Sequence, residues 1–272
     1  MFHLIVNYCS GGLGNRLKPL ASCGVISTDA KVNLGMFWQP TMRCQTHFND
    51  LFKNQFQQFD DDTLGALGNV EIHTVPWYID HDLGLNRFRS LKSLSVNFPI
   101  RELSANMDHT HNIVVYNNDW LPTVPQEESN KFLKTLQPLD FLQDEIEKFC
   151  KENAIDKSVI GVHARGTDFE DGSDILGGYI RAIESVTGRV FVCSDSLDYE
   201  NTLKSRFGDR IIFRKKQSYV CKHNPCQSWV NNVQTPMASV QESLIDLYIL
   251  SRTNFTIYNP SSTFAHVALA LS

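Results

Sequence analysis

The sequence lacks any long hydrophobic run and any basic leader. The amino-terminal stretch MFHLIVNYCS holds only a short apolar segment, and no window reaches the roughly 18 apolar residues that a membrane span needs. These absences disfavour a signal peptide and a spanning helix. We expect a cytoplasmic or otherwise soluble intracellular protein, although a chain trimmed of a leader or an anchor would look the same.

The sequence also has no excess of positive charge. It carries 25 Lys and Arg residues against 30 Asp and Glu, a formal net charge of −5, and its pI is near 6.0. Because phosphate contacts supply most non-specific affinity for nucleic acid, this balance disfavours a nucleic-acid partner. Hydrophobic residues make up 42% of the 272 residues, which is the content of a folded protein rather than of a disordered chain.

Cysteine shows no disulfide framework. The seven cysteines are an odd number without regular spacing, which fits reduced thiols in a reducing compartment. Cys221, His223 and Cys226 form the densest group, and their soft ligands are a candidate zinc site. A fourth ligand and the usual C-x-x-C spacing are missing, so a loop with two free thiols is the better interpretation and we expect no metal.

Several motifs of common enzyme classes are absent. The stretch CSGGLGNR at 9–16 follows the first apolar run and matches neither G-x-x-x-x-G-K-[ST] nor G-x-G-x-x-G. No G-x-S-x-G occurs either, so a nucleoside triphosphatase, a dehydrogenase and a generic hydrolase are disfavoured. The glycines at 11, 12 and 14 permit positive φ and close backbone approach. A strand, a glycine turn and a helix make a candidate anion cradle here, although a plain βα turn fits equally well.

The order of the apolar runs predicts an α/β protein. In the second half we expect strands at 158–163, 189–194, 210–213 and 255–258, alternating with helices at 176–187, 197–207, 237–251 and 261–271. This alternation predicts a parallel sheet with helices on both faces. In the first half we expect strands at 2–8, 31–38 and 111–117, and helices at 15–26, 127–136 and 139–153, with a short helix and loop in 48–59. The length favours two domains with a boundary near 150–157.

Most aromatic residues are expected in the core, because aromatic rings carry much of the burial in small domains. Trp38 and Trp120 lie near predicted loops, so either ring could instead stack on the face of a sugar. The segment 214–236 is long for a loop in a compact domain and could be a lid or a substrate contact.

Polar side chains gather where three strands of the second half end. They are His163, Arg165 and Asp168 after the first strand, Ser194 to Ser196 after the second, and Asn259 and Ser261 to Thr263 after the last. The carboxyl ends of parallel strands face one crevice, so these groups could converge on a single ligand. The last group opens a helix, whose amides and dipole favour a phosphate, and Arg165 is a natural partner for a diphosphate. An ordinary strand end with a solvated loop is the alternative for each group.

Four stretches together resemble the fucosyltransferases with an H-x-R signature, which comprise α-1,2-, α-1,6- and protein O-fucosyltransferases. They are GGLGNRL at 11–17, HARGTDF at 163–169, VFVCSDS at 190–196 and ESLIDLYILSRTNFTIYNPSSTFAHVALA at 242–270. The resemblance implies a GT-B-like α/β fold of two Rossmann-like domains facing a central cleft. An acceptor-side domain would span 1–155 and a nucleotide-sugar-binding domain 156–272. The implied reaction is an inverting, metal-independent transfer of fucose from GDP-fucose to a glycan hydroxyl.

The resemblance also implies roles for individual residues. Arg165 would stabilise the charge on the departing diphosphate, His163 would lie near the nucleoside, and Asp195 would accept hydrogen bonds from the base or the ribose. The other implied donor-binding residues are Gly12, Gly14 and Asn15 in the amino-terminal loop, and Ser261, Ser262, Thr263 and Phe264 at the start of the last helix. The nucleotide sugar and a glycan acceptor are the implied partners, with no metal and no separate cofactor.

The sequence departs from the family at Gly166, where the α-1,6 branch has a second arginine. This departure puts the donor sugar in doubt, so another GDP-sugar or UDP-xylose stays open, as does a non-catalytic nucleotide- or glycan-binding module. An inverting displacement also needs a general base. The candidates are the carboxylates Asp168, Glu170, Asp171 and Asp174. A solvated acidic loop fits this run equally well, and Asp168 could instead orient Arg165.

Overall fold

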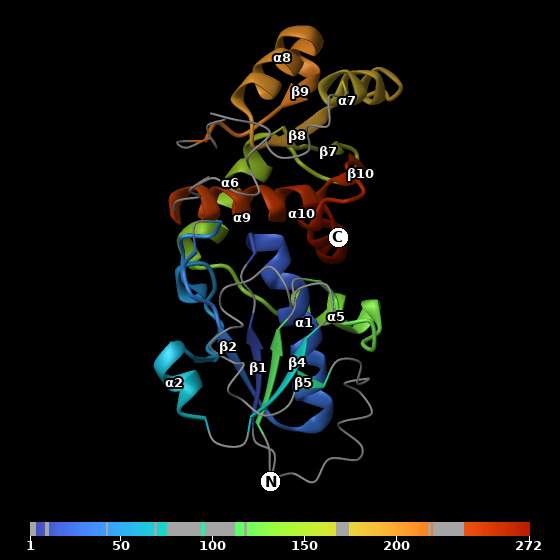
Figure 1. Ribbon diagram of the computed structural model, residues 1–272. Coiled ribbons are helices and arrows are strands. Elements are labelled where there is room, and N and C mark those ends of the chain that lie inside the picture. The colour runs from blue at the N-terminus through green and yellow to red at the C-terminus, as the bar shows by residue number, and fades with distance from the viewer. Residues whose placement is uncertain are drawn as a thin grey trace. The chain divides into compact units, whose positions relative to one another are not determined.

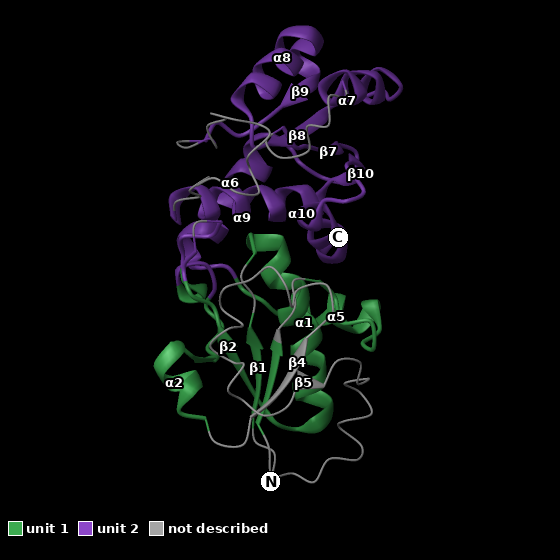
Figure 2. Ribbon diagram, in the orientation of Figure 1, with its two compact units in different colours: residues 1–39, 47–49, 53–137 green, residues 40–46, 50–52, 138–272 purple. Residues whose placement is uncertain are grey.

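The computed structural model describes residues 4–8, 11–41, 43–67, 70–74, 94–95, 112–116, 119–166, 174–216, 219 and 237–272. The chain forms two compact units, which Figure 2 shows in different colours. The first unit comprises residues 1–39, 47–49 and 53–137, and the second comprises 40–46, 50–52 and 138–272. Each unit contains one parallel sheet with helices packed around it, so the predicted α/β class is confirmed.

The first unit is built on a sheet with strand order β3-β2-β1-β6-β4-β5, in which all recorded neighbours pair in parallel. Its strands are β1 (Leu4–Tyr8), β2 (Asn33–Phe37), β3 (Gln57–Gln58), β4 (Val70–Thr74), β5 (Leu94–Ser95) and β6 (Asn112–Tyr116). Its helices are α1 (Leu13–Ala30), α2 (Asp61–Gly65) and α5 (Gln126–Leu133), and the short 3-10 turn η1 spans Phe48–Asp50.

Apolar residues on both faces of β1 explain why this strand lies inside the sheet. Ile5 packs with Cys23 and Ile26 of α1, whereas its neighbours Leu4 and Val6 pack on the opposite face with Phe37 of β2. Successive side chains of a strand point to opposite faces, so an unbroken apolar run suits a strand that is covered on both sides.

The second unit is built on a sheet with strand order β10-β7-β8-β9, again parallel throughout. Its strands are β7 (Ile160–Ala164), β8 (Val190–Ser194), β9 (Ile211–Ile212) and β10 (Asn254–Tyr258). Its helices are α6 (Asp140–Glu152), α7 (Ile175–Glu184), α8 (Leu197–Phe207), α9 (Met237–Arg252) and α10 (Thr263–Leu271), and the 3-10 turn η3 spans Gly208–Arg210. Figure 1 shows α9 and α10 beside each other, and the two helices are in contact.

Helices cover both faces of the second sheet. Val162 and Val192 pack on one face with Ile183 of α7 and Leu203 of α8. Phe191 lies between Val190 and Val192 in β8, and its side chain points to the opposite face of the sheet. There its ring centre lies 5.8 Å from that of Phe149 in α6. Helix α9 contacts β7, β8 and α6, so it belongs to this second layer.

The division between the two units lies before α6 and not near residue 155, where we expected the domain boundary. The compact units divide between Gln137 and Pro138, and α6 lies with the second unit. The reason is tertiary, because α6 packs on α9 and Glu147 pairs with Arg252 at the end of α9. The roles of the two domains, acceptor-side and nucleotide-sugar-binding, stay predictions.

Some local predictions for the first half need correction. The expected helix in 48–59 is only the single turn η1, and α2, β3, β4 and β5 were not foreseen. Helix α1 begins at Leu13, two residues before the predicted start, so Pro19 lies in its second turn and not in its first. A proline there removes one backbone donor from the helix. No helix in the described ranges has both the length and the apolar character to cross a membrane.

Each sheet has one topological switch point. In the second unit the chain runs from β7 to β8 to β9 in one direction, and β10 then returns to the other side of β7. In the first unit β2 and β3 lie on one side of β1, whereas β6 lies on the other. Ligands of open α/β sheets bind beyond the carboxyl ends of the strands at such points. The topology therefore marks the ends of β7 and β10, and those of β1 and β6, as candidate sites.

Candidate functional site at the end of the second sheet

The groups that follow β7 and β10 meet at the switch point of the second sheet. His163, near the end of β7, is buried, and its Nδ1 lies 3.2 Å from the hydroxyl of Ser262. Its ring stacks on that of Phe264 in α10, with the ring centres 4.8 Å apart. The structure thus brings together two of the groups that the sequence analysis expected to converge.

The imidazole of His163 is neutral at physiological pH. Burial lowers its pKa to about 3, and the nearby positive charge of Arg165 acts in the same direction. Ser262 Oγ accepts a hydrogen bond from the backbone N–H of Ala265, so its own proton is available for Nδ1 of His163. A group that does not titrate near neutral pH is a poor general base. His163 instead ties the end of β7 to the start of α10.

The start of α10 has the properties of an anion site. Ser262 caps the helix, and the backbone N–H of Ser261 donates to the side chain of Asn259 at 2.9 Å. The N–H groups of Thr263 and Phe264 belong to the first turn of α10, where the helix itself supplies no acceptor. Free amides at a helix start, together with the helix dipole, favour a phosphate.

The backbone around Arg165 is held on both sides. Its own N–H donates to the hydroxyl of Tyr179 at 3.3 Å, and the next N–H, of Gly166, donates to Asp195 Oδ1 at 2.7 Å. Ser194 donates to the carbonyl of Ala164 at 2.5 Å. The strand ends of β7 and β8 are therefore fixed to each other next to Arg165. Asp195 contributes to this fixation, while its predicted contact with the base or the ribose stays a prediction.

Gly166 is in a place where a side chain does not fit freely. A Cβ there would lie 3.0 Å from Cβ of Ser196 and 3.1 Å from the ring of Tyr199. The chain thus departs from the double arginine of the α-1,6 branch at a position where α8 crowds the strand end.

We expect Gly166→Ala to destabilise the protein by about 1 to 3 kcal/mol, because Ser196 and Tyr199 would have to move to admit the methyl group. The free energy of unfolding in urea measures this effect. Gly178→Ala is the matched control, since nothing lies within 4 Å of a Cβ at this position of α7. The control should stabilise the helix by about 0.5 to 1 kcal/mol. Equal effects of the two substitutions would contradict the crowding at Gly166.

A buried network of charges acts on His163, and the sequence does not reveal it. Lys216 Nζ lies 2.6 Å from a carboxylate oxygen of Glu200 in α8 and 3.0 Å from one of Asp246 in α9. Arg214 Nε contacts the other oxygen of Asp246 at 2.9 Å, and Tyr219 donates to Glu200 at 2.5 Å. The side chains of Glu200 and Asp246 are almost completely buried. No motif signals such a network, because its members are far apart in the sequence.

The network is electrostatically coupled to the candidate site. Burial disfavours the charged form of Lys216, but the attraction of nearby acidic groups, of which Asp246 acts most strongly, outweighs it, so the pKa of Lys216 lies above its ordinary value. Burial raises the pKa of Glu200, and the charge of Lys216 opposes this change. Asp246 and Lys216 also act on the pKa of His163, in opposite directions. Through Lys216 the network joins α8 and α9, and the charges of Lys216 and Asp246 act on His163 of β7.

The amino-terminal glycine loop follows β1 in the first unit. Gly12 is the N-cap of α1 with φ of −70°, a backbone that any residue adopts, so the positive φ that glycine permits is not used there. Close approach is the reason for Gly11, since a Cβ there would lie 2.5 Å from Cβ of Asn15. Arg16 is completely buried and donates to the carbonyls of Gly11 and Gln39 at 2.8 and 3.0 Å. Arg16 therefore fixes the loop that the sequence analysis assigned to the donor through Gly12, Gly14 and Asn15.

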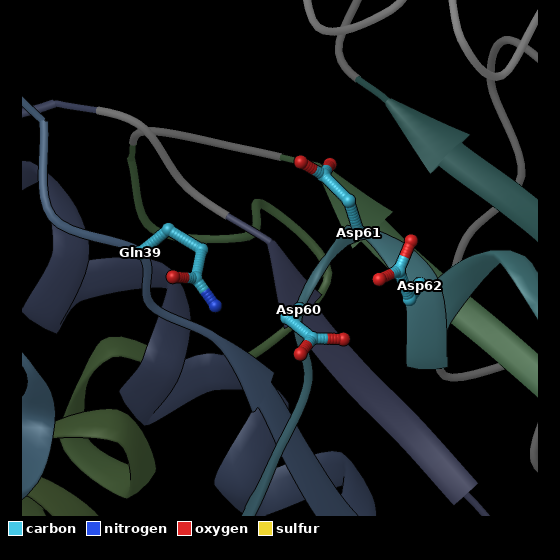
Figure 3. Close-up of a pocket in the computed structure, with 4 residues that line it drawn as sticks. All are labelled: Gln39, Asp60, Asp61 and Asp62. Atoms are coloured by element: carbon cyan, nitrogen blue, oxygen red, sulfur yellow. The ribbon is translucent and has the colours of Figure 1, made fainter.

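A separate cavity of roughly 590 Å³ lies in the first unit, beyond the ends of β2 and β3. It is lined by Gln39, Asp60, Asp61 and Asp62, which Figure 3 shows as sticks. Asp60 caps α2 by accepting from the N–H of Thr63 at 2.8 Å. A cavity rich in carboxylates repels a diphosphate, so we do not assign it to a nucleotide sugar.

Several predicted residues lie outside the described residues. They are Asp168, Glu170 and Asp171 among the candidate bases, and Cys221, His223 and Cys226 of the weighed zinc site. Asp174 is described, and its carboxylate caps α7 through the N–H of Gly177 at 2.9 Å and pairs with Arg181 at 3.2 Å. Its contacts are those of a helix cap. In the part of the chain that the structure covers, no group of three or more His, Cys, Asp or Glu side chains could hold a metal ion.

Comparison with known proteins identifies the fold. No family model matches the sequence, and no curated protein matches it. Among solved structures, the chain is similar to NodZ α-1,6-fucosyltransferase soaked with GDP-fucose, with a TM-score of 0.68 and 18% identity over 100% of this chain and 93% of that one. Fucosyltransferase NodZ from Bradyrhizobium matches with a TM-score of 0.66 and 17% identity over 98% and 92% of the two chains.

Two further structures share the arrangement. POFUT1 in complex with GDP-fucose matches with a TM-score of 0.58 and 13% identity, covering 99% of this chain and 94% of that one. A variant of Arabidopsis thaliana FUT1 in complex with GDP matches with a TM-score of 0.60 and 16% identity, covering 100% of this chain and 69% of that one. The GT-B-like fold that the sequence motifs implied is therefore confirmed.

Proposed function

We propose that this protein is a glycosyltransferase that moves fucose from GDP-fucose to a hydroxyl of a glycan, with inversion and without a metal ion. One observation carries the proposal: the residues around Arg165 and the start of α10 meet at the switch point of the second sheet. His163 connects them, with its Nδ1 3.2 Å from Ser262. The same fold occurs in structures of fucosyltransferases in complex with GDP-fucose or GDP, which supports a donor of this class.

The proposed donor contacts follow from the chemistry of each group. The N–H groups of Thr263 and Phe264, with the hydroxyls of Ser261 and Thr263, hold the phosphates, while Ser262 positions this helix start through its bonds to His163 and Ala265. Arg165 contacts the β-phosphate, for which a planar, permanently charged guanidinium is well suited. Phe264 and His163 pack together at the nucleoside end, and Asp195 accepts from the ribose or the base. The donor contacts that the glycine motif implies for Gly12, Gly14 and Asn15 stay predictions.

The proposed reaction is an in-line displacement at the anomeric carbon. The bond from this carbon to the diphosphate oxygen breaks while the acceptor oxygen forms a new bond on the opposite face. Negative charge develops on the leaving GDP, and Arg165 with the α10 dipole stabilises it. A carboxylate takes the proton of the acceptor hydroxyl, and Asp168, Glu170 and Asp171 are the candidates.

The glycine at position 166 favours a second candidate function, with the same fold and reaction but another donor. The α-1,6 branch has an arginine at this position, so one positive charge near the donor is missing here. Another GDP-sugar or UDP-xylose is the alternative donor. A non-catalytic module that binds a nucleotide or a glycan is the alternative from another class.

A donor panel tests the proposal. We expect hydrolysis or transfer with GDP-fucose, weaker turnover with GDP-mannose and none with UDP-xylose, measured by release of the nucleoside diphosphate. Activity should persist in EDTA, and proton NMR of the product should show the inverted anomeric configuration. Turnover of UDP-xylose alone would reverse the donor assignment. Binding of GDP without turnover of any donor, at any pH, would favour the non-catalytic module.

A further inference from the structure

A second candidate site lies at the switch point of the first sheet, between the ends of β1 and β6. The segment 119–121 follows the end of β6, and the first turns of α1 follow the end of β1. β1 and β6 are neighbours and pair in parallel, so both connections leave the sheet at the same edge. This edge is where open α/β sheets bind ligands, and the donor site proposed above uses the equivalent edge of the other sheet.

Lys18 is the unusual residue at this edge. Its side chain is only 1% exposed, and its ammonium pairs with Asp119. Burying an ammonium is costly unless a counterion is held against it. The same ammonium lies 5.7 Å from the centre of the Trp120 ring, a cation–π distance. The buried ammonium of Lys18 in α1 therefore holds two consecutive residues after β6, Asp119 and Trp120.

Further hydrogen bonds hold this segment on α1. The N–H of Leu121 donates to the hydroxyl of Ser22 at 3.1 Å, and Ser22 lies four residues after Lys18 on the same face of the helix. The N–H of Trp120 donates to Asp119 Oδ1 at 2.7 Å. The indole of Trp120 is thus positioned by its neighbours, while the residue stays partly exposed to solvent.

We propose that Trp120 and Asp119, held by Lys18, form a binding subsite for one pyranose ring of the acceptor glycan. An indole presents a flat apolar face to the C–H groups of a sugar, and a carboxylate accepts hydrogen bonds from its hydroxyls. The side chain of Asp119 is 56% exposed, so a hydroxyl can reach it. An exposed carboxylate disfavours a diphosphate, so the subsite suits the uncharged acceptor and not the donor. The assignment of this subsite to the acceptor rests on the proposed function, whereas its assignment to a sugar rests on the geometry alone.

NMR of the indole N–H groups tests the subsite directly. The chain has four tryptophans, and the resonance that disappears in Trp120→Phe identifies Trp120. The probes are the methyl glycosides of glucose, galactose, N-acetylglucosamine and xylose, added to tens of millimolar. We expect at least one of them to shift the Trp120 resonance in a saturable manner. Backbone amide shifts, which every variant retains, should show about tenfold weaker binding to Trp120→Ala. Trp120→Phe should keep part of the affinity.

The controls separate a sugar subsite from a structural role and from the proposed reaction. Phe141→Ala removes an exposed aromatic ring from α6 and should leave glycoside binding unchanged. The Kd for GDP should be the same in all variants, and an acceptor found by transfer assays should show a raised KM with Trp120→Ala at unchanged donor hydrolysis. No shift of the Trp120 resonance with any glycoside, or equal affinity of Trp120→Ala, overturns the subsite. A wild-type protein without donor turnover refutes the proposed function and leaves the NMR result standing.

Discussion

Replacement of Arg165 by alanine is expected to weaken GDP binding about 10- to 150-fold. A charge-assisted hydrogen bond contributes about 1.5 to 3 kcal/mol, which converts to this range. The rate of transfer should fall further, by roughly two to three orders of magnitude, because the charge on the leaving diphosphate grows in the transition state. Calorimetry with GDP and steady-state kinetics with GDP-fucose measure the two effects separately.

Two companion variants make the Arg165 experiment specific. Arg165→Lys keeps the charge but loses the planar, two-pronged guanidinium, so it should bind GDP with an affinity between those of the wild type and Arg165→Ala. Arg206→Ala removes an arginine of α8 that is half exposed and pairs with Glu184 at 2.5 Å, and should leave the Kd for GDP unchanged. Unaltered GDP binding by Arg165→Ala would remove Arg165 from the proposed site.

Replacement of Lys216 by methionine is expected to lower the free energy of unfolding by about 3 to 5 kcal/mol at pH 7. Lys216 is the cation between the buried carboxylates of Glu200 and Asp246, and removal of one partner leaves buried charge without compensation. Denaturation in urea measures the loss. The double variant Lys216→Met with Glu200→Gln should recover part of it, since one of the stranded charges is then absent.

The loss caused by Lys216→Met should depend on pH with a defined sign. Burial already raises the pKa of Glu200 in the folded protein, and the charge of Lys216 limits this rise. Without Lys216 the folded pKa rises further, so the folded state binds more protons than the unfolded chain and gains stability as the pH falls. The gap between variant and wild type should narrow from pH 7 to pH 5.

A surface lysine provides the comparison for Lys216. Lys131 of α5 pairs with Glu127 one turn away at 2.8 Å, and both side chains are largely exposed. Exposed pairs of this kind contribute little to stability. Lys131→Met should therefore change neither the free energy of unfolding nor its dependence on pH to a measurable degree. A loss as large as that of Lys216→Met would show that removal of any lysine charge, and not burial, is responsible.

Regular elements of the second half were predictable because their signals are local. The apolar run around Val192 predicts a buried strand, and Ser196 before a polar helical stretch predicts the start of α8, which begins at Leu197. In the first half, β3 and β5 have two residues each, too few to show a period in the sequence. α2 has five residues and depends on its N-cap Asp60, whose side chain accepts from the N–H of Thr63, a signal that is easily passed over.

Contacts inside the candidate site were predictable only in part. The polar residues after β7, β8 and β10 follow from the position of each strand end, and parallel pairing makes their meeting an expectation. The stacking of His163 on Phe264 and the bond from Gly166 to Asp195 depend on which strands are neighbours. Local sequence holds no information on strand order, because many orders accommodate the same alternation of strands and helices.

The sequence by itself determined that the protein is α/β, that β1, β7 and β8 are buried strands, and that Arg165 and the serines before α10 stand at strand ends. These properties depend on hydrophobic pattern, turn residues and motifs, all of which are local. Tertiary structure alone decided that β10 lies beside β7 and β6 beside β1, which places both switch points. It also decided that Lys216 lies between two distant carboxylates and that Lys18 is buried beneath Trp120. Long-range packing fixes such neighbours, since it is the summed burial of whole elements, and not any short stretch, that selects one arrangement.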